Sequence, residues 1–205
     1  LTNWAHQERM EFAPNPYYHG QQPAIAKLVF VQAADANQAF FAYQNGELDA
    51  VAVPDANVRL VLQDPALKGQ VVRFNELTAF GFQFNVKNPP LDHVKVRQAI
   101  AMAVDREALV EKVAQGVGRV AYSVVPPGMP GHEEQLGRDF AFNPARAKAL
   151  LGEAGYQDPA QFPVLVNSFF DNSTNRARAE FFQAQMKQNL WIQVTLEPLD
   201  AKTFQ

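Results

Sequence analysis

Few residues in this sequence combine the type and the spacing that catalysis or metal binding requires. Glu47 and Asp49 could form a carboxylate pair, but no third polar partner lies close to them in the sequence, which favours a solvated turn. His132 stands beside two glutamates without a second histidine at ligand spacing, so a solvated loop is favoured over a metal site. The sequence therefore predicts no metal site.

Nucleophiles and phosphate-binding loops have no better support. The serines lack an adjacent glycine elbow and the histidines show no triad spacing: Ser123, Ser168, Ser173, His6, His19, His93 and His132. Gly116 and Gly118 alone are too short for a dinucleotide fingerprint, and no G-x-x-x-x-G-K-[ST] loop is present. The absence of cysteine excludes thiol catalysis, disulfides and cysteine-based zinc sites within these residues. We therefore predict no catalytic residue and no cofactor.

The composition is that of an ordinary globular protein, with 205 residues of which 47% are hydrophobic and 19% are charged. The formal net charge of -3 gives no electrostatic reason to expect nucleic acid or an anionic membrane as a partner. No apolar run approaches the roughly 18 residues that cross a bilayer. The chain opens on Leu1 without an initiator methionine, and we expect it to be part of a longer protein.

The stretch 82–113 organises the rest of the chain. Apolar and polar residues alternate at its start, which predicts a strand over 77–86 that ends before Pro89. A helix follows, with Asp92 as its expected N-cap. Its apolar residues recur at helical spacing: Val96, Ala99, Ile100, Ala103 and Val104. Asp105 is the expected cap of a second helix.

Strands and helices alternate on both sides of that stretch. The further expected strands are 9–12, 27–32, 48–53, 70–74, 120–125, 163–169 and 191–197. The further expected helices begin at Asp35, at Asn143 and at Asn172 or Ser173, and a short helix is expected over 58–62, ended by Asp64 and Pro65. Because the strand at 27–32, the next helix and the strand at 48–53 have short links, they indicate a parallel crossover. The predicted fold class is therefore α/β.

The order of residues across the strand, the turn and the two helix starts is more specific than their periodicity. It resembles the signature of the family 5 extracellular solute-binding proteins, the oligopeptide, dipeptide and nickel receptors of ABC importers. The matching positions are Asn85, Pro90, Asp92, Val94, Val96, Arg97, Gln98, Ala99, Ala103, Asp105 and Arg106. Segments 11–18, 46–49, 122–128 and 143–156 are also similar to the family. Trp191 departs from a small residue in the family pattern, so we expect a different helix exit.

The resemblance implies an α/β fragment of a periplasmic-binding-protein-like fold of the class II type, with a mixed sheet flanked by helices. Residues 1–76 would form the C-terminal part of the first lobe and the crossover, and residues 77–205 the second lobe, truncated at its C-terminal end. Position within the family pattern gives six expected ligand-binding residues: Gly81, Phe82, Gln83, Asn167, Asn172 and Asn175. For each of them a structural role is an open alternative.

The resemblance further implies a solute-binding component of an ABC importer, which captures a peptide or similar small solute and delivers it to permease subunits without catalysis. It would work in the periplasm or elsewhere outside the cytoplasm, with any membrane anchor in a segment preceding Leu1. A ligand-sensing module and a hydrolase acting between the lobes stay open as alternatives. The ligand could be a peptide, a nickel chelate, an oligosaccharide or an opine. Exposed strand edges within 27–74 could allow self-association.

Overall fold

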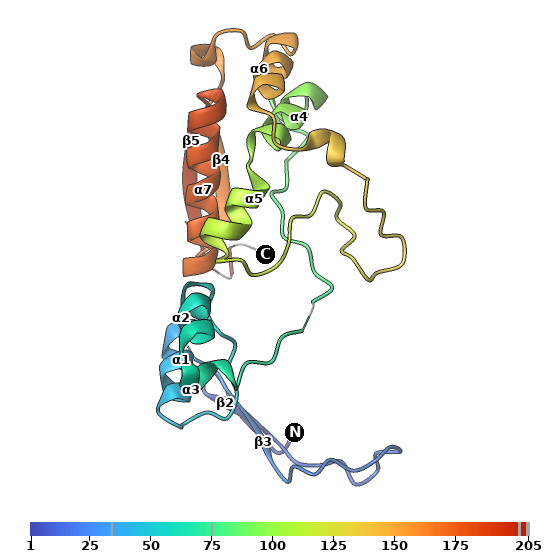
Figure 1. Ribbon diagram of the computed structural model, residues 1–205, viewed down its shortest axis with the longest axis vertical. Helices are drawn as coiled ribbons and strands as arrows, with labels where there is room; N and C mark the ends of the chain where they lie inside the picture. The colour runs from blue at the N-terminus through green and yellow to red at the C-terminus, as the bar shows by residue number, and fades with distance from the viewer. Residues whose placement is uncertain (34, 75, 201, 204–205) are drawn as a thin grey trace. The chain divides into compact units, whose positions relative to one another are not determined.

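The computed structural model describes residues 1–33, 35–74, 76–200 and 202–203 (Figure 1). These residues form two compact units, Leu1–Asn57 and Val58–Gln205. Both contain helices and strands, as the α/β interpretation requires. Across the described ranges, no helix has the length and the apolar character to span a membrane.

The first unit contains a small antiparallel sheet and one longer helix. Strands β1 (Asn3–Ala5), β2 (Arg9–Phe12) and β3 (Leu28–Val31) lie in that order, and β2 pairs with both neighbours. Helix α1 (Ala36–Gln44) begins at Asp35, whose side chain accepts a hydrogen bond from the backbone N–H of Asn37 at 2.7 Å. The expected cap at Asp35 is therefore confirmed.

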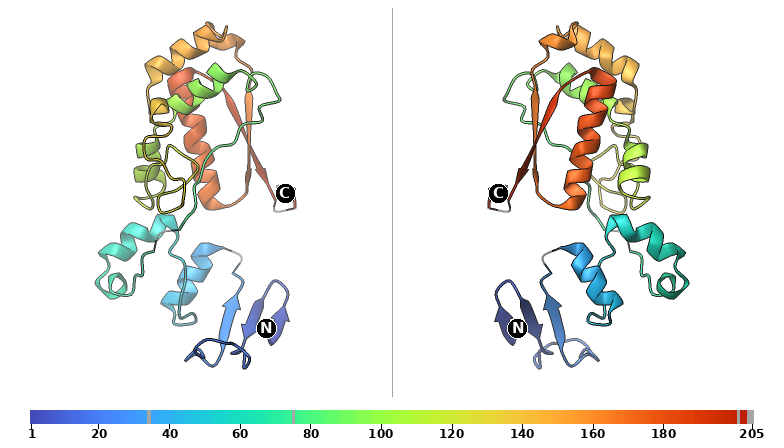
Figure 2. Two further views of the ribbon diagram at one scale, coloured as in Figure 1. Left: turned by 90° about the vertical axis from the view of Figure 1, so that its right-hand side faces the viewer. Right: turned by 90° about the vertical axis from the view of Figure 1, so that its left-hand side faces the viewer.

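The second unit is built around a parallel strand pair and a long helix (Figure 2). Strand β4 (Leu165–Phe170) leads into α7 (Ser173–Leu190), which returns to β5 (Val194–Leu199) beside β4. The other helices are α2 (Val58–Gln63), α3 (Pro65–Lys68), α4 (Val94–Ala103), α5 (Arg106–Ala108) and α6 (Pro144–Glu153). A π-helical turn, Leu109–Val113, continues α5. The long helix and its two flanking strands therefore follow the predicted succession.

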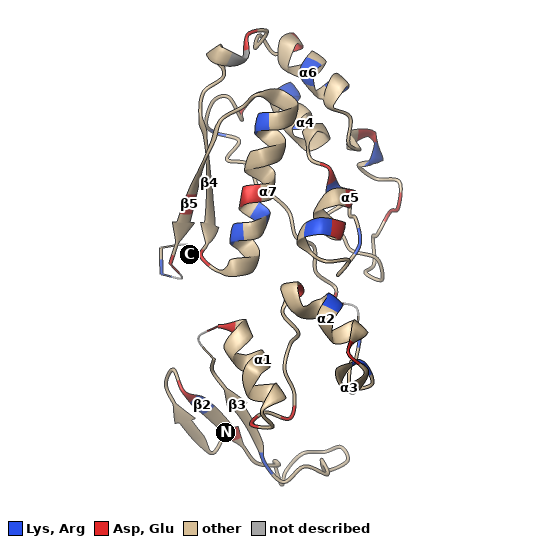
Figure 3. Cartoon of the chain, turned by 60° about the vertical axis from the view of Figure 1, so that its left-hand side comes forward, with Lys and Arg blue, Asp and Glu red and all other residues tan. Residues whose placement is uncertain are grey.

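The core of the second unit lies where α4, α6 and α7 meet. Its innermost apolar side chains are no more than 1% exposed: Val96, Ala99, Ile100, Ala103, Ala147, Met186, Leu190 and Ile192. The charged positions of α7 are spread along the helix and include Arg176, Arg178, Glu180 and Lys187 (Figure 3). Burial of each large core side chain contributes about 1.5–3 kcal/mol. The apolar stripe predicted for α4 is thus confirmed.

Four expected strands do not form, which corrects the sequence interpretation. The described residues of 48–53, 70–74, 77–86 and 120–125 have no strand structure, and β3 pairs only with β2, antiparallel, so no parallel crossover joins 27–32 to 48–53. A strand needs a neighbour for its backbone hydrogen bonds, and no described segment pairs with these four. The expected alternation survives in part, because Phe82 and Phe84 are half-buried while Gln83 is exposed.

Helix ends followed the sequence closely, with two corrections. Helix α4 is capped by His93, not by Asp92: the Nδ1 of His93 accepts from the backbone N–H of Lys95 at 3.2 Å. The Asp92 carbonyl instead accepts a hydrogen bond from Arg97. Trp191 ends α7 in the left-handed conformation, with φ of 58°, that a glycine would adopt there. The expectation of a different helix exit is therefore wrong, because α7 ends in the usual left-handed conformation although the residue there is a bulky tryptophan.

Candidate ligand-binding site

Two residues of the pattern that resembles family 5, Arg97 and Asp105, bond to backbone groups with their side chains. Arg97 donates through Nη1 to the carbonyls of Leu91 and Asp92, at 2.8 and 2.9 Å, and so fixes the turn before α4. Asp105 accepts from the backbone N–H of Ala108 at 2.9 Å and caps α5 as predicted. A charged donor serving two carbonyls is stronger than a neutral one. Arg97 and Asp105 therefore have a structural role in this unit.

The C-terminal end of α4 is bonded to the helix that follows it and to two segments that are distant in the sequence. A helix leaves its last carbonyls without internal partners, and here side chains and backbone supply them. Arg106 donates to the carbonyl of Ala101 at 3.1 Å, the backbone N–H of Asn143 donates to Met102 at 2.8 Å, and Asn189 donates to Ala103 at 2.8 Å. These bonds fix α5, α6 and α7 to one helix end, which makes this part of the unit a rigid support.

Phe82 lies against that support. Its ring stacks on Phe182 of α7 with centroids 4.3 Å apart, and meets Phe80 edge-on at 5.6 Å. The guanidinium of Arg178 lies over the Phe80 ring at 4.3 Å. The side chains of Phe80 and Phe82 therefore hold this segment against α7. The residues next to Phe82, Gly81 and Gln83, are exposed.

The three asparagines lie near the junction of β4 and α7. Asn172 caps α7, because its side chain accepts from the backbone N–H of Asn175 at 2.8 Å, and Asn175 in turn donates to the Phe170 carbonyl at 3.1 Å. Asn167 lies on β4 with alternation that places it on the same face as Leu165 and Phe169. Its Nδ2 is buried and has no acceptor among the described residues. The side chains of Asn172 and Asn175 are thus hydrogen-bonded within the chain, whereas the amide donor of Asn167 has no acceptor among the described residues.

Asn172 and Asn175 are thus hydrogen-bonded to each other and Phe82 stacks on α7, but no hydrogen bond or ring contact joins Phe82 to either asparagine. The contact of Phe80 with Arg178 was missed by sequence reasoning. The spacing of Phe80, Phe82 and Phe84 could have suggested Phe80, whereas nothing in the sequence marks Arg178 as its partner. Among these residues Phe82 is stacked on Phe182, Asn172 and Asn175 bond to the chain itself, and Asn167 has a buried amide donor without an acceptor among the described residues.

Metal-ligating side chains are scattered over the parts of the chain that the structure describes. No group of three or more histidine, aspartate or glutamate side chains could hold a metal ion there. Ser168 donates to Glu197 at 2.5 Å on the exposed side of the strand pair.

Comparison with known proteins gives a consistent result. A family model described as bacterial extracellular solute-binding proteins, family 5 middle, matches residues 1–205. The dipeptide-binding protein of Escherichia coli (strain K12) is 32% identical over 194 residues, which are 90% of this chain and 34% of that protein. Heme-binding protein A of Haemophilus influenzae is 35% identical over 141 residues, which are 68% of this chain and 25% of that protein. These relatives are named as binding proteins.

Solved structures show the same fold. A periplasmic oligopeptide-binding protein from Borrelia burgdorferi is similar with a TM-score of 0.76 and 28% identity, covering 97% of this chain and 39% of that one. The murein tripeptide binding protein of Escherichia coli is similar with a TM-score of 0.82 and 24% identity, covering 100% of this chain and 41% of that one. The chain thus spans about a third to two fifths of the length of such relatives.

Proposed function

Because this chain belongs to the bacterial extracellular solute-binding proteins of family 5, we propose that the intact protein captures a peptide or similar small solute for an ABC importer. The match of the family model over residues 1–205 carries the proposal. The relatives with peptide-binding names favour a peptide, while heme-binding protein A supports a wider ligand range. Capture would take place in the periplasm or elsewhere outside the cytoplasm, and delivery would be to the permease subunits.

We retain six residues as proposed ligand contacts: Gly81, Phe82, Gln83, Asn167, Asn172 and Asn175. Three of them, Gly81, Gln83 and Asn167, present groups that a ligand could contact. Gly81 and Gln83 are exposed beside an anchored aromatic ring, and Asn167 has a buried amide donor without an acceptor among the described residues. A buried donor of this kind costs free energy until an acceptor reaches it. A peptide carbonyl is a suitable acceptor. We also propose that the chain crosses from the first lobe to the second near Glu76, before the segment that contains Gly81 and Gln83.

Calorimetric titration of the intact, ligand-free protein would test this proposal. We expect saturable binding of one class among dipeptides, tripeptides, heme and nickel chelates, without turnover. Asn167→Ala and Gln83→Ala should weaken binding, whereas Gln188→Ala, an exposed change on α7, should leave it unchanged. Absence of saturable binding across the panel would contradict the proposal.

The two alternatives make different predictions for the same protein. A hydrolase would release product from a bound substrate, and Glu47→Gln or Asp49→Asn would abolish the release. A sensing module would bind ligand without stimulating ATP hydrolysis by the permease. We expect no product release, and stimulation of the reconstituted permease by the liganded protein.

A further inference from the structure

A hollow lies between the C-terminal ends of α6 and α7 in the second unit. Its volume is about 240 Å³, and its walls come from α6, from the turn that follows α6 and from the end of α7. Apolar and aromatic side chains predominate, and Lys148 is the only charged residue among those that line it in the described part of the chain. We call this hollow the α6–α7 groove, and its walls include Lys148, Gly152, Tyr156, Phe162, Leu190 and Trp191.

Trp191 forms one wall of the α6–α7 groove in a strained backbone conformation. Its φ of 58° lies in the left-handed region, where glycine is favoured at a helix end. Its side chain is nevertheless 54% exposed, so it gains only part of the stabilisation that a buried tryptophan has. A strained residue whose side chain stays in solvent indicates a role other than packing.

Gly152 shows the opposite departure within α6. Glycine inside a helix is unfavourable relative to alanine, because it loses more backbone freedom on folding. A Cβ built on Gly152 would meet no atom within 4 Å outside its own helix, so packing does not exclude a side chain there. The lack of a side chain keeps the α6–α7 groove open. A bulky residue where glycine fits and a glycine where a side chain fits therefore line the same groove.

Lys148 gives the groove its charge. Its Nζ lies 3.9 Å from the centroid of the Trp191 ring, and no carboxylate among the described residues forms an ion pair with it. Glu153, next to Gly152, is already paired with basic side chains of α4 and α6. The last carbonyls of α6 and α7 accept hydrogen bonds from the backbone that follows, which weakens the negative ends of both helices. A carboxylate in the groove would therefore meet an ammonium that no other carboxylate neutralises.

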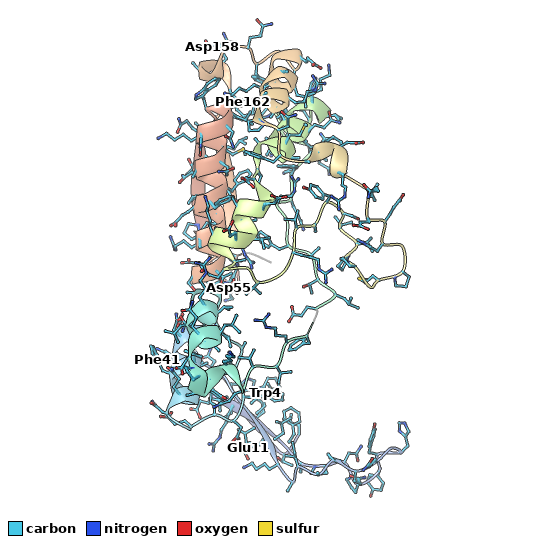
Figure 4. The ribbon with its side chains drawn as sticks, in the orientation of Figure 1. Trp4, Glu11, Phe41, Asp55, Asp158 and Phe162 are labelled. Atoms are coloured by element: carbon cyan, nitrogen blue, oxygen red, sulfur yellow. The ribbon has the colours of Figure 1, made fainter. Side chains whose placement is uncertain are left out.

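The rest of the groove suits a ring or a branched apolar group. The rings of Tyr156 and Phe162 meet edge-on with centroids 4.8 Å apart, and Phe162, labelled in Figure 4, is 8% exposed. The carboxamide of Gln157 lines the same hollow and can donate to an oxygen. Since an apolar cavity of about 150 Å³ holds benzene, the larger volume here leaves room for one ring that carries a carboxylate.

We propose that the α6–α7 groove binds a small amphipathic anion, a carboxylate attached to one aromatic or branched aliphatic group. The ammonium of Lys148 pairs with the carboxylate, and the apolar body lies against Phe162 and Trp191. Apolar walls with few convergent polar groups are the usual composition of a small-molecule site. None of the six proposed solute contacts lines this groove, so the inference does not depend on the proposed function.

Phenylacetate is the probe, and phenylacetamide is its uncharged counterpart of nearly equal shape. In a titration of the intact protein followed by NMR, the indole N–H signal of Trp191 is assigned with the Trp191→Phe variant. We expect phenylacetate to shift this signal and to saturate the shift with a dissociation constant of about 1 mM or lower. Phenylacetamide should bind about tenfold more weakly, because it lacks the charge that Lys148 attracts.

Two variants separate the charge of the groove from its space. Lys148→Gln should weaken phenylacetate binding about tenfold and leave phenylacetamide binding unchanged. Lys112→Gln, which changes an exposed lysine in the π-helical turn after α5, is the matched control and should alter neither affinity. Gly152→Leu fills the hollow and should abolish the shift with both probes. It should not lower the melting temperature, since leucine is the better helix former.

Several results would overturn the proposal. They are the absence of a Trp191 shift up to about 10 mM phenylacetate, equal affinity for the two probes, and equal phenylacetate affinity of Lys148→Gln and the parent protein. A shift that persists in Gly152→Leu would place the binding outside the groove. If Gly152→Leu fails to fold, the two probes on Lys148→Gln and the parent protein decide. Solute capture should be the same in Lys148→Gln and the parent protein, so a failure of the groove and a failure of the proposed function are measured separately.

Discussion

The two compact units differ in how far they bury their own apolar side chains. In Val58–Gln205, helices α4, α6 and α7 enclose one continuous core. In Leu1–Asn57, Phe40 is the only buried apolar residue among those that the structure describes, and the sheet exposes aromatic rings. The sheet of the first unit is nevertheless regularly paired. Backbone pairing therefore needs only adjacent strands, whereas burial needs a second layer.

The largest expected effect tests whether the second unit carries the stability of the chain. Ile100 is 1% exposed within the core, so Ile100→Ala should lower the free energy of unfolding by about 2–5 kcal/mol, through lost burial and the cavity left behind. Urea denaturation of the 205-residue chain measures it. Val94→Ala, a change at 53% exposure on the same helix, should stay within about 0.5 kcal/mol. A similar loss for both would mean that the core is loosely packed.

A somewhat smaller effect is expected at the polar junction of α4 and α7. Asn189 is 8% exposed and donates to the Ala103 carbonyl and to Gln185. Asn189→Leu should lower the free energy of unfolding by about 1–3 kcal/mol, because it leaves the Ala103 carbonyl buried without a donor. Hydrogen exchange should show the loss around the start of α5. The exposed change Gln188→Leu provides the control, and an equal cost there would remove the special role of Asn189.

Local sequence signals predicted local structure well. The sequence correctly predicted the core stripe of α4 and four helix caps: Asp35, Asp105, Asn143 and Asn172. Both features depend only on residues within one or two helical turns. The resemblance to family 5 could be recognised from the order of residues along the sequence and is confirmed over the whole chain.

Contacts between segments that are distant in the sequence could not be predicted. Asn189 and Ala103 lie 86 positions apart, and no pattern in either neighbourhood indicates the bond between them. The strands expected at 48–53 and 77–86 failed likewise, since a strand exists only where a neighbour pairs with it. Of the candidate ligand residues, Asn172 was open to a capping role from the start, and the six contacts stay predictions.

A third prediction concerns the end of α7, where strain and packing nearly cancel. The left-handed conformation of Trp191 costs about 1–2 kcal/mol relative to glycine, and the contact of Lys148 with its ring, at 3.9 Å, returns about 0.5–1 kcal/mol. Trp191→Gly should therefore change the free energy of unfolding by less than about 1 kcal/mol, because glycine also gains freedom in the unfolded chain. Trp191→Ala, which keeps the strain and loses the contact, should be the less stable of the two by urea denaturation. The reverse order would show that the left-handed conformation at this position costs less than the extra freedom of glycine in the unfolded chain.

The smallest effect is expected at Glu153, an exposed link between two helices of the well-packed unit. Its carboxylate accepts from Lys95 of α4 at 3.0 Å and from Arg146 of α6 at 2.7 Å, and these bonds, Lys95 first, lower its pKa. Since the folded pKa lies below the unfolded value of 4.5, this stabilisation is complete above that pH and is lost as the pH falls through the folded value. Glu153→Gln should therefore be slightly less stable than the parent chain at pH 7, with a difference that disappears in acid.

Denaturation midpoints measured from neutral to acidic pH would show this convergence. Glu134→Gln is the matched control, because Glu134 is 76% exposed and contacts Arg138 at 3.4 Å within a single turn, where an ion pair contributes little. A difference for Glu153→Gln that persists unchanged in acid would mean that shape, and not charge, joins α4 to α6. The contrast between the two units would then rest on apolar packing alone.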